Sequence, residues 1–95
     1  MPKTSPTEIK FVDVKVLDIS TIHISQNDAR NLDFAETGVL KTEHGFLVNV
    51  CVFHAKLSYT RALVKIMKLA SDNDYEFVKF DSLGQEYDEL EKFNW

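Results

Sequence analysis

The first part of the sequence alternates between apolar and polar side chains. Val12, Val14 and Val16 fall on one face of an extended chain, and the charged residues between them fall on the other. This period of two predicts a half-buried strand. The alternation slips at Leu17–Asp18 and resumes around His23, so one bent strand and two strands separated by a bulge both fit.

A helix is expected directly after this strand. Ser25 stands three residues before Asp28, which is the spacing of a capping box with aspartate in place of the preferred glutamate. The spacing predicts a helix from Gln26 to about Ala35. Gly38 follows shortly and suits the end of a helix.

The middle of the chain predicts a hairpin and a second helix. Strands are expected at residues 39–43 and 46–53, around a turn at Gly45. Both faces of the second strand are apolar, which is typical of a central strand. Ser58 is the expected cap of the second helix, and a last strand follows at residues 75–81. The buried stripe of that helix is expected at Leu63, Ile66, Met67 and Ala70.

The order strand, helix, strand, strand, helix, strand predicts an α+β fold. We expect one two-layer domain, with an antiparallel sheet and two helices on one face, in the ferredoxin-like layout or a close relative. Residues 1–7 are expected to be a flexible lead-in, and residues 8–95 to be the domain. Residues 82–95 lack a helical pattern. Their apolar side chains are expected to pack back onto the domain: Leu83, Leu90, Phe93 and Trp95.

Charge is distributed unevenly along the chain. Residues 72–95 hold eight acidic side chains and two lysines, although the whole chain carries a net charge of only −4. Such a region repels nucleic-acid phosphates and attracts basic protein surfaces, so direct nucleic-acid binding is not expected. The alternative is an ordinary solvated surface. The interface candidates are Asp72, Asp74, Glu76, Glu86, Tyr87, Asp88, Glu89, Glu91 and Trp95.

Few other chemical signals are present. The single cysteine, Cys51, cannot form an internal disulfide and suits a reducing cytoplasm as a buried thiol. The sequence shows neither a signal peptide nor an apolar run of membrane-spanning length, so we expect a cytoplasmic protein without membrane attachment. It also lacks a phosphate-binding loop and metal-ligand spacing, so we expect no cofactor and no metal.

The stretch DISTIHIS, residues 18–25, combines a histidine with three hydroxyl side chains. His23 as a general base with Ser20, Thr21 or Ser25 as a nucleophile would make an enzyme. However, the backbone holds side chains two residues apart on a strand away from each other. We therefore predict that His23 is buried and hydrogen-bonded to a distant acid such as Asp81, and that no residue is catalytic. The structural residues of this hypothesis are Ser20, Thr21, His23, Ser25 and Asp81.

Two further alternatives concern the sheet. A nucleic-acid-binding regulator would stack bases on strand aromatics, but Phe46 and Phe53 fall on opposite faces of their strand. A sheet face left free of helices would favour dimerisation, so a homodimer stays open as an alternative.

Two stretches together resemble a known kind of protein. ISTIHIS near the N-terminus and FVKFDSLGQEYDELEKFNW at the C-terminus are similar to the ends of a small uncharacterised family carried by bacterial plasmids, prophages and integrative elements. Phe93 stands where that family more often has tyrosine. The matching positions are Ile19, Ser20, Thr21, His23, Ile24, Ser25, Asp81, Gly84, Asp88, Leu90, Phe93 and Trp95.

The resemblance implies an accessory gene of a mobile element. Small acidic proteins from such elements resemble inhibitors of host defence, the anti-restriction and anti-CRISPR proteins, which act by binding. We therefore expect a phage or plasmid protein whose acidic surface imitates nucleic acid and docks on the basic, nucleic-acid-binding surface of a host defence complex.

Overall fold

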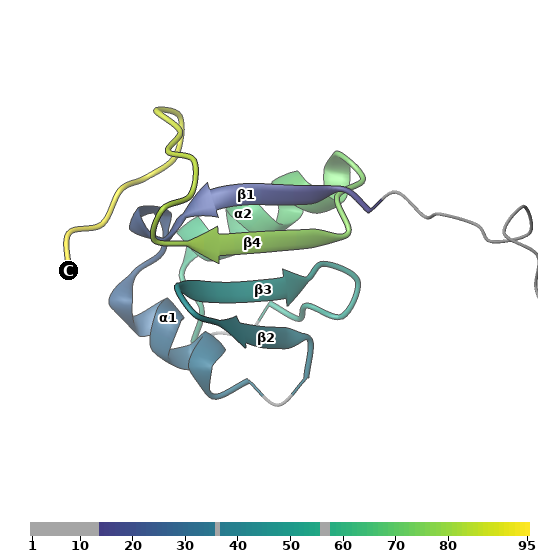
Figure 1. Cartoon of the computed structure of the whole chain (residues 1–95), viewed down its shortest axis with the longest axis horizontal. Coiled ribbons are helices and arrows are strands. Elements are labelled where there is room, and N and C mark those ends of the chain that lie inside the picture. The colour runs from purple at the N-terminus through teal and green to yellow at the C-terminus, as the bar shows by residue number, and fades with distance from the viewer. Residues whose placement is uncertain (1–13, 36, 56–57) are drawn as a thin grey trace, which may run out of the picture.

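The computed structural model describes residues 14–35, 37–55 and 58–95. In these residues a four-stranded sheet carries two α-helices on one face (Figure 1). The predicted lead-in, Val12 and the predicted start of the domain at residue 8 lie outside the described residues. The elements are β1 (Val16–Ser20), the 3₁₀ helix η2 (Thr21–His23), α1 (Gln26–Asp33), β2 (Val39–Thr42), β3 (Gly45–Asn49), α2 (Arg61–Asp72) and β4 (Phe77–Asp81).

The strands lie in the order β1-β4-β3-β2. The predicted fold class is confirmed: the chain forms a small two-layer α+β domain with the predicted element order. The predicted antiparallel sheet is wrong in one detail, because β1 runs parallel to β4 while the other pairs are antiparallel. The direction of β4 depends on where the chain re-enters the sheet after α2, which no local pattern encodes. With β1 at the edge, the domain is a relative of the ferredoxin-like layout, in which the first strand lies inside the sheet.

The core lies between the sheet and the helices. All four residues of the predicted α2 stripe are buried, which confirms that helix face. The sheet faces them with side chains from β1, β3 and β4, three of which are completely buried. The buried apolar residues are Leu17, Ile19, Ile24, Ala29, Leu32, Val48, Leu63, Ile66, Met67, Ala70, Val78 and Phe80.

The first strand buries the opposite face from the one predicted. Val14 and Val16 are 44% and 41% exposed, whereas Leu17 and Ile19 enter the core. The predicted alternation slips at Leu17, and a shift by one residue exchanges the two faces of a strand. The odd-numbered residues Leu17 and Ile19 therefore face the helices in place of Val14 and Val16. The segment around His23 is the 3₁₀ helix η2 and not a second strand.

The starts of the helices explain a buried carboxylate. Ser25 caps α1 as predicted, since its Oγ accepts a hydrogen bond from the Asp28 N–H at 3.0 Å. Thr60, not the predicted Ser58, caps α2. The Asp28 carboxylate is fully buried and accepts hydrogen bonds from the Thr60 N–H, at 2.9 Å, and from the Thr60 hydroxyl. Asp28 therefore ties the start of α2 to α1.

The central strand is shorter than predicted. β3 lies inside the sheet, as expected, but it ends at Asn49. The Asn49 side chain then accepts a hydrogen bond from the Cys51 N–H at 2.9 Å, which forms a turn. Cys51 and Val52 are exposed, so the expected burial of the thiol is wrong.

Candidate functional site

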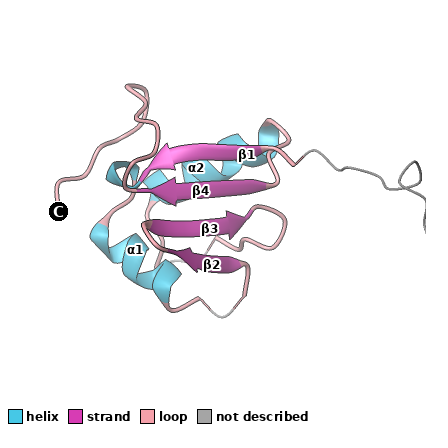
Figure 2. Ribbon diagram, in the orientation of Figure 1, coloured by secondary structure: helices cyan, strands magenta, loops and turns pink. Residues whose placement is uncertain are grey.

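The tail, residues 82–95, crosses the carboxyl ends of β1 and β4 as an irregular segment (Figure 2). The Ser20 N–H donates a hydrogen bond to the Gln85 carbonyl at 2.8 Å. The crossing is so close that a Cβ added at Gly84 would lie 2.6 Å from the carbonyl carbon of Ile19. Only glycine fits there without displacing backbone, so the tail is a close-packed part of the domain.

The buried side chain of His23 forms hydrogen bonds with the backbone of the tail. Its side chain is completely buried, its Nδ1 lies 2.8 Å from the Glu91 carbonyl oxygen, and its Nε2 accepts the Tyr87 N–H at 2.9 Å. Because a carbonyl can only accept and an amide can only donate, the ring is neutral with its proton on Nδ1. Both nitrogens are therefore engaged, and neither is free to act as a base.

The prediction of a buried, hydrogen-bonded His23 is confirmed, but its expected partner is wrong. The ring nitrogens bond to Glu91 and Tyr87 and not to Asp81. The Asp81 Oδ1 instead accepts a hydrogen bond from the Leu83 N–H at 2.8 Å and shapes the turn into the tail. The partners of His23 are backbone groups. An irregular segment has backbone N–H and C=O groups without ladder partners, and a buried side chain can satisfy them.

Three more hydrogen bonds join the tail to the DISTIHIS stretch. The Tyr87 hydroxyl donates to the Asp18 carbonyl at 3.0 Å, and the Phe93 N–H donates to the Ile22 carbonyl at 2.7 Å. The Trp95 Nε1–H donates to the Ile24 carbonyl at 2.8 Å. The two ends of the sequence that carry the resemblance therefore form one packed unit.

The remaining residues of DISTIHIS also have local structural roles. The Ser20 Oγ accepts a hydrogen bond from the Ile22 N–H at 3.2 Å and begins η2. Ser25 is occupied as the cap of α1. The Thr21 carbonyl accepts a hydrogen bond from the Ile24 N–H at 3.2 Å. This arrangement positions the tail and does not assemble a nucleophile with a base.

The acidic side chains of the tail face solvent. The tail contains four carboxylate side chains and one cation, Lys92. The Lys92 Nζ lies 3.9 Å from Glu86 and 3.5 Å from Asp88. The tail thus carries a net charge of −3 on a backbone that is held by hydrogen bonds. We call these exposed side chains the tail acids: Glu86, Asp88, Glu89 and Glu91.

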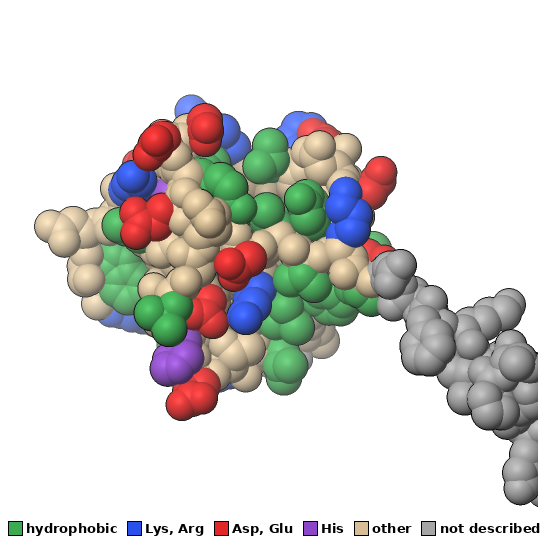
Figure 3. Space-filling view, turned by 45° about the horizontal axis from the view of Figure 1, so that its top comes forward, with side chains coloured by type: hydrophobic (Ala, Val, Ile, Leu, Met, Phe, Trp, Pro, Cys, Tyr) green, Lys and Arg blue, Asp and Glu red, His purple; other side chains and the backbone are tan. Residues whose placement is uncertain are grey.

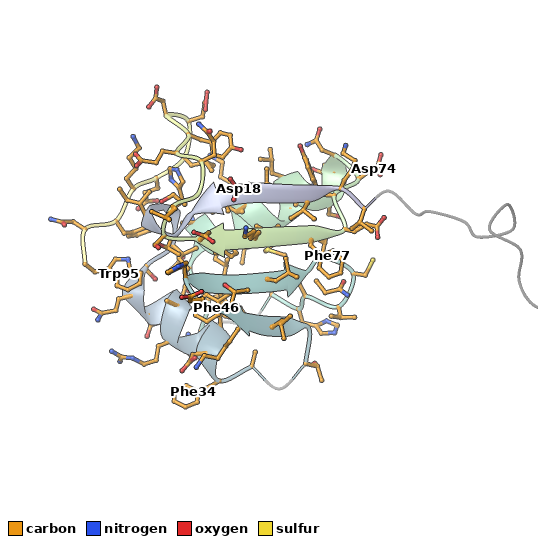
Figure 4. The ribbon with its side chains drawn as sticks, viewed as in Figure 1. Asp18, Phe34, Phe46, Asp74, Phe77 and Trp95 are labelled. Carbon is orange, nitrogen blue, oxygen red and sulfur yellow. The ribbon has the colours of Figure 1, made fainter. Side chains whose placement is uncertain are left out.

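The other predicted interface acids lie elsewhere. Asp72, Asp74 and Glu76, which we call the helix-end acids, are exposed at the end of α2, just before β4 begins. The tail follows the other end of β4, and Figure 4 accordingly shows Asp74 and Trp95 at opposite ends of the sheet. The acidic interface candidates of residues 72–95 are therefore divided between two separate surfaces.

The aromatic candidates differ in how available they are. Trp95 is 57% exposed although its ring nitrogen is bonded. Tyr87 is half-buried against the core. Burial raises the pKa of Tyr87, and Tyr75 and the carboxylates of Asp18 and Glu89 raise it further.

Leu83 was a missed candidate for a contact surface. The apolar pattern predicts that it packs back onto the domain, but it is 83% exposed near the start of the tail. The Asp81 turn directs its side chain outward, and nothing in the local sequence distinguishes it from Leu90, which does pack against the core.

The structure gives little support to metal binding by histidines or to base stacking on the sheet. His44 and His54 are exposed, and the described residues include no group of three or more side chains suited to hold a metal. Phe46 packs against the core and Phe53 stacks on Tyr59 with ring centroids 5.4 Å apart. Neither aromatic ring is placed to stack a base on the sheet face that lacks helices.

Among the described residues, no helix is both long and apolar enough to cross a bilayer. Comparison with known proteins adds a family. No curated protein and no solved structure matches the chain. Residues 16–95 match the C-terminal domain of a family of unknown function, DUF5983, and this range begins with β1 and includes the whole tail. Because the match covers most of the chain, the protein belongs to the DUF5983 family of unknown function.

Proposed function

We propose that this domain is a binding protein, and that it docks its tail acids on the basic, nucleic-acid-binding surface of another protein. One observation carries the proposal: four exposed carboxylates project from a backbone segment that is fixed by His23 and Trp95. A surface that is already ordered loses little conformational entropy on binding. Its net charge would also accelerate encounter with a basic partner.

The tail also offers an apolar contact beside its charge. Leu83 and Trp95 are both exposed in the same segment as the tail acids. Protein interfaces combine a few large apolar or aromatic anchors with a charged rim. Trp95 is the anchor of this proposal, and Tyr87 contributes by supporting the tail from inside.

The partner in this proposal is a defence complex of a bacterial host, and the protein is an inhibitor made in the host cytoplasm from a phage or plasmid gene. The resemblance to proteins of mobile elements supports this identification. Carboxylates on an ordered backbone can occupy the sites that phosphates would otherwise fill, so the acidic surface suits an anti-restriction or anti-CRISPR protein.

The first experiment is a pull-down with the tagged protein from lysate of a natural host, washed at rising salt and analysed by mass spectrometry. We expect a nuclease or guide-RNA complex that is released at high salt, because a charged interface is screened. The variant Glu86→Lys/Asp88→Lys/Glu89→Lys should lose this complex while its thermal unfolding stays nearly unchanged.

The matched control places three lysines at the helix-end acids, Asp72, Asp74 and Glu76, and should still retain the complex. If the tail variant retains the complex as well as the unmodified protein does, the tail acids are not the docking surface. If neither protein retains anything, the proposal fails, and a small-molecule screen with a His23→Gln variant becomes the next step.

A further inference from the structure

The outer edge of β1 has backbone groups that no described residue pairs with. Lys15, Leu17 and Ile19 direct their backbone groups toward β4, as the Lys15 carbonyl shows by accepting the Phe77 N–H at 3.4 Å. The residues between them direct theirs away from the sheet. The tail uses the Ser20 N–H and the Asp18 carbonyl.

The other outward backbone groups of Val16 and Asp18 have no hydrogen-bond partner among the described residues. Among the described residues, none pairs with the Asp18 N–H or with the N–H and carbonyl of Val16. An edge with free donors and acceptors is a template on which another strand can pair.

An apolar groove lies along the same edge, between β1 and α2. It has a volume of about 290 Å³. Leu69 of α2 is 45% exposed and forms part of the groove wall. The remaining wall consists of Leu17, Ile19, Tyr87 and Leu90, with Lys65 and Glu89 as its charged members. Figure 3, turned so that this side comes forward, shows hydrophobic side chains gathered beside the acidic side chains of the tail.

The groove and the free edge suit one kind of occupant together. In a strand added to β1, alternate side chains would point to the helix side of the sheet and enter the groove beside Leu17 and Ile19. The backbone groups of that strand would meet those of Val16 and Asp18. A small apolar molecule would use the groove alone, whereas an extended peptide uses both features.

The charges around the groove indicate what the peptide carries. Glu89 lines the groove together with Lys65. Asp18 lies between Leu17 and Ile19 on β1, so its side chain points to the other face of the sheet at the same edge. Within the described part of the chain neither carboxylate has an ion-pair partner. Because Glu89 shares the groove with Lys65, it is the carboxylate of Asp18 that favours a lysine or arginine on the incoming segment.

We propose that the β1–α2 groove binds an extended segment of a partner protein, which adds to the edge of β1 as a strand and places an apolar side chain in the groove and a basic one near Asp18. This surface goes beyond the proposed function, since it does not require the remaining tail acids to contact a defence complex. The bound segment has alternating apolar positions, and its affinity comes from backbone hydrogen bonds together with the buried side chain.

The test uses a displayed library of random peptides of about six residues, the length of a typical strand, selected on the full chain. We expect enriched sequences that alternate apolar residues and include lysine or arginine. A synthetic copy of an enriched peptide should bind Leu69→Glu about tenfold or more weakly than the unmodified protein, since a carboxylate would then enter the apolar groove. Leu83→Glu, which adds the same charge at an exposed leucine outside the groove, should bind normally.

Two further measurements separate strand addition from other modes. Amide hydrogen exchange should slow at Val16 and Asp18 when the peptide binds. Val16→Pro removes one outward N–H and leaves the hydrogen bonds between β1 and β4 intact. This variant should stay folded and bind the peptide more weakly. It therefore serves as the test if Leu69→Glu does not fold. The proposal would be overturned if no peptide is enriched. It would also be overturned if Leu69→Glu and Val16→Pro both bind the peptide as tightly as the unmodified protein does. Self-association that Leu69→Glu abolishes would also overturn it, by making a second copy the occupant.

Discussion

The tail acids and the helix-end acids have similar exposure but different surroundings. Beside the helix-end acids, Lys68 pairs with Asp72 at 3.1 Å, and the Lys15 Nζ donates to the Asn73 carbonyl at 2.8 Å. Three carboxylates there lie near two lysines, whereas within the described residues Lys92 is the one cation that pairs with any of the four tail acids. The comparison shows that a count of acidic residues along a sequence does not locate an electrostatic surface.

The two regions also differ in how their backbones are fixed. The helix-end acids lie at and just after the last turn of a regular helix, where main-chain hydrogen bonds such as Asn73 N–H to Leu69 carbonyl maintain the geometry. The tail acids lie on irregular backbone, which depends on side chains from distant residues, above all His23. Four measurements test this difference.

The largest effect is expected from His23→Ala. This change leaves a cavity and two unpaired backbone groups, so the free energy of unfolding should fall by about 2–4 kcal/mol. The midpoint of thermal unfolding should fall by on the order of 10–20 °C. Asn73→Ala, which removes the exposed side-chain bond at the end of α2, should change it much less.

His23→Gln adds a control for a chemical role. A glutamine can reproduce part of the hydrogen bonding, so this variant should be more stable than His23→Ala. A variant with unchanged stability and lost biological activity would contradict the structural role and favour chemistry at His23.

The second effect concerns binding to the retained host partner. We expect Glu86→Gln/Asp88→Asn/Glu89→Gln to weaken the complex about tenfold or more. Asp72→Asn/Asp74→Asn/Glu76→Gln makes the same change in charge at the other surface and should leave the affinity nearly unchanged. Asparagine also tolerates the positive φ of 62° at Asp74. Interferometry at two salt concentrations measures both, and equal losses would mean that only total charge matters.

A third and smaller effect is expected from Trp95→Phe. The ring remains apolar, but the hydrogen bond to the Ile24 carbonyl is lost, so unfolding should become easier by about 0.5–1.5 kcal/mol. Amide exchange should accelerate at Phe93 and stay constant in α2. Faster exchange in both regions would show that the tail and the helix open together.

The smallest effect is expected at alkaline pH. Because burial and nearby carboxylates raise the pKa of Tyr87 in the folded chain, the unfolded chain loses its proton first as the pH rises above about 10. Stability should therefore decline above that pH, and the decline should be shallower in Tyr87→Phe. Urea titrations at neutral and alkaline pH measure this, and an identical slope in both proteins would contradict it.

Regular elements were predictable where side-chain spacing alone determines them. The α2 stripe from Leu63 to Ala70 and the Ser25 cap were predicted from local patterns. The buried face of β1 was not, because Val14 and Leu17 are equally apolar and only the position of the helices decides which one is covered. The parallel pairing of β1 with β4 depends on contacts between residues far apart in the sequence.

The candidate site shows the same division. The acidic residues and the burial of His23 could be predicted, because charge and the local pattern are readable in the sequence. The division into two acidic surfaces could not, since β4 separates Glu76 from Glu86 by its whole length only after folding. The partners of His23 were also hidden, because backbone carbonyl and amide groups have no sequence signature.

The edge position of β1 has a consequence for folding kinetics. Among the described strands, β1 forms a ladder with β4 alone, so Val16 must wait for Phe77, and His23 for Tyr87 and Glu91. The β2–β3 hairpin, by contrast, joins residues close together in the chain. During synthesis, the hairpin can therefore form first, while the β1–β4 ladder waits until β4 has left the ribosome. Contacts of such long sequence separation slow folding, so closure of the tail over β1 is expected to be the final step.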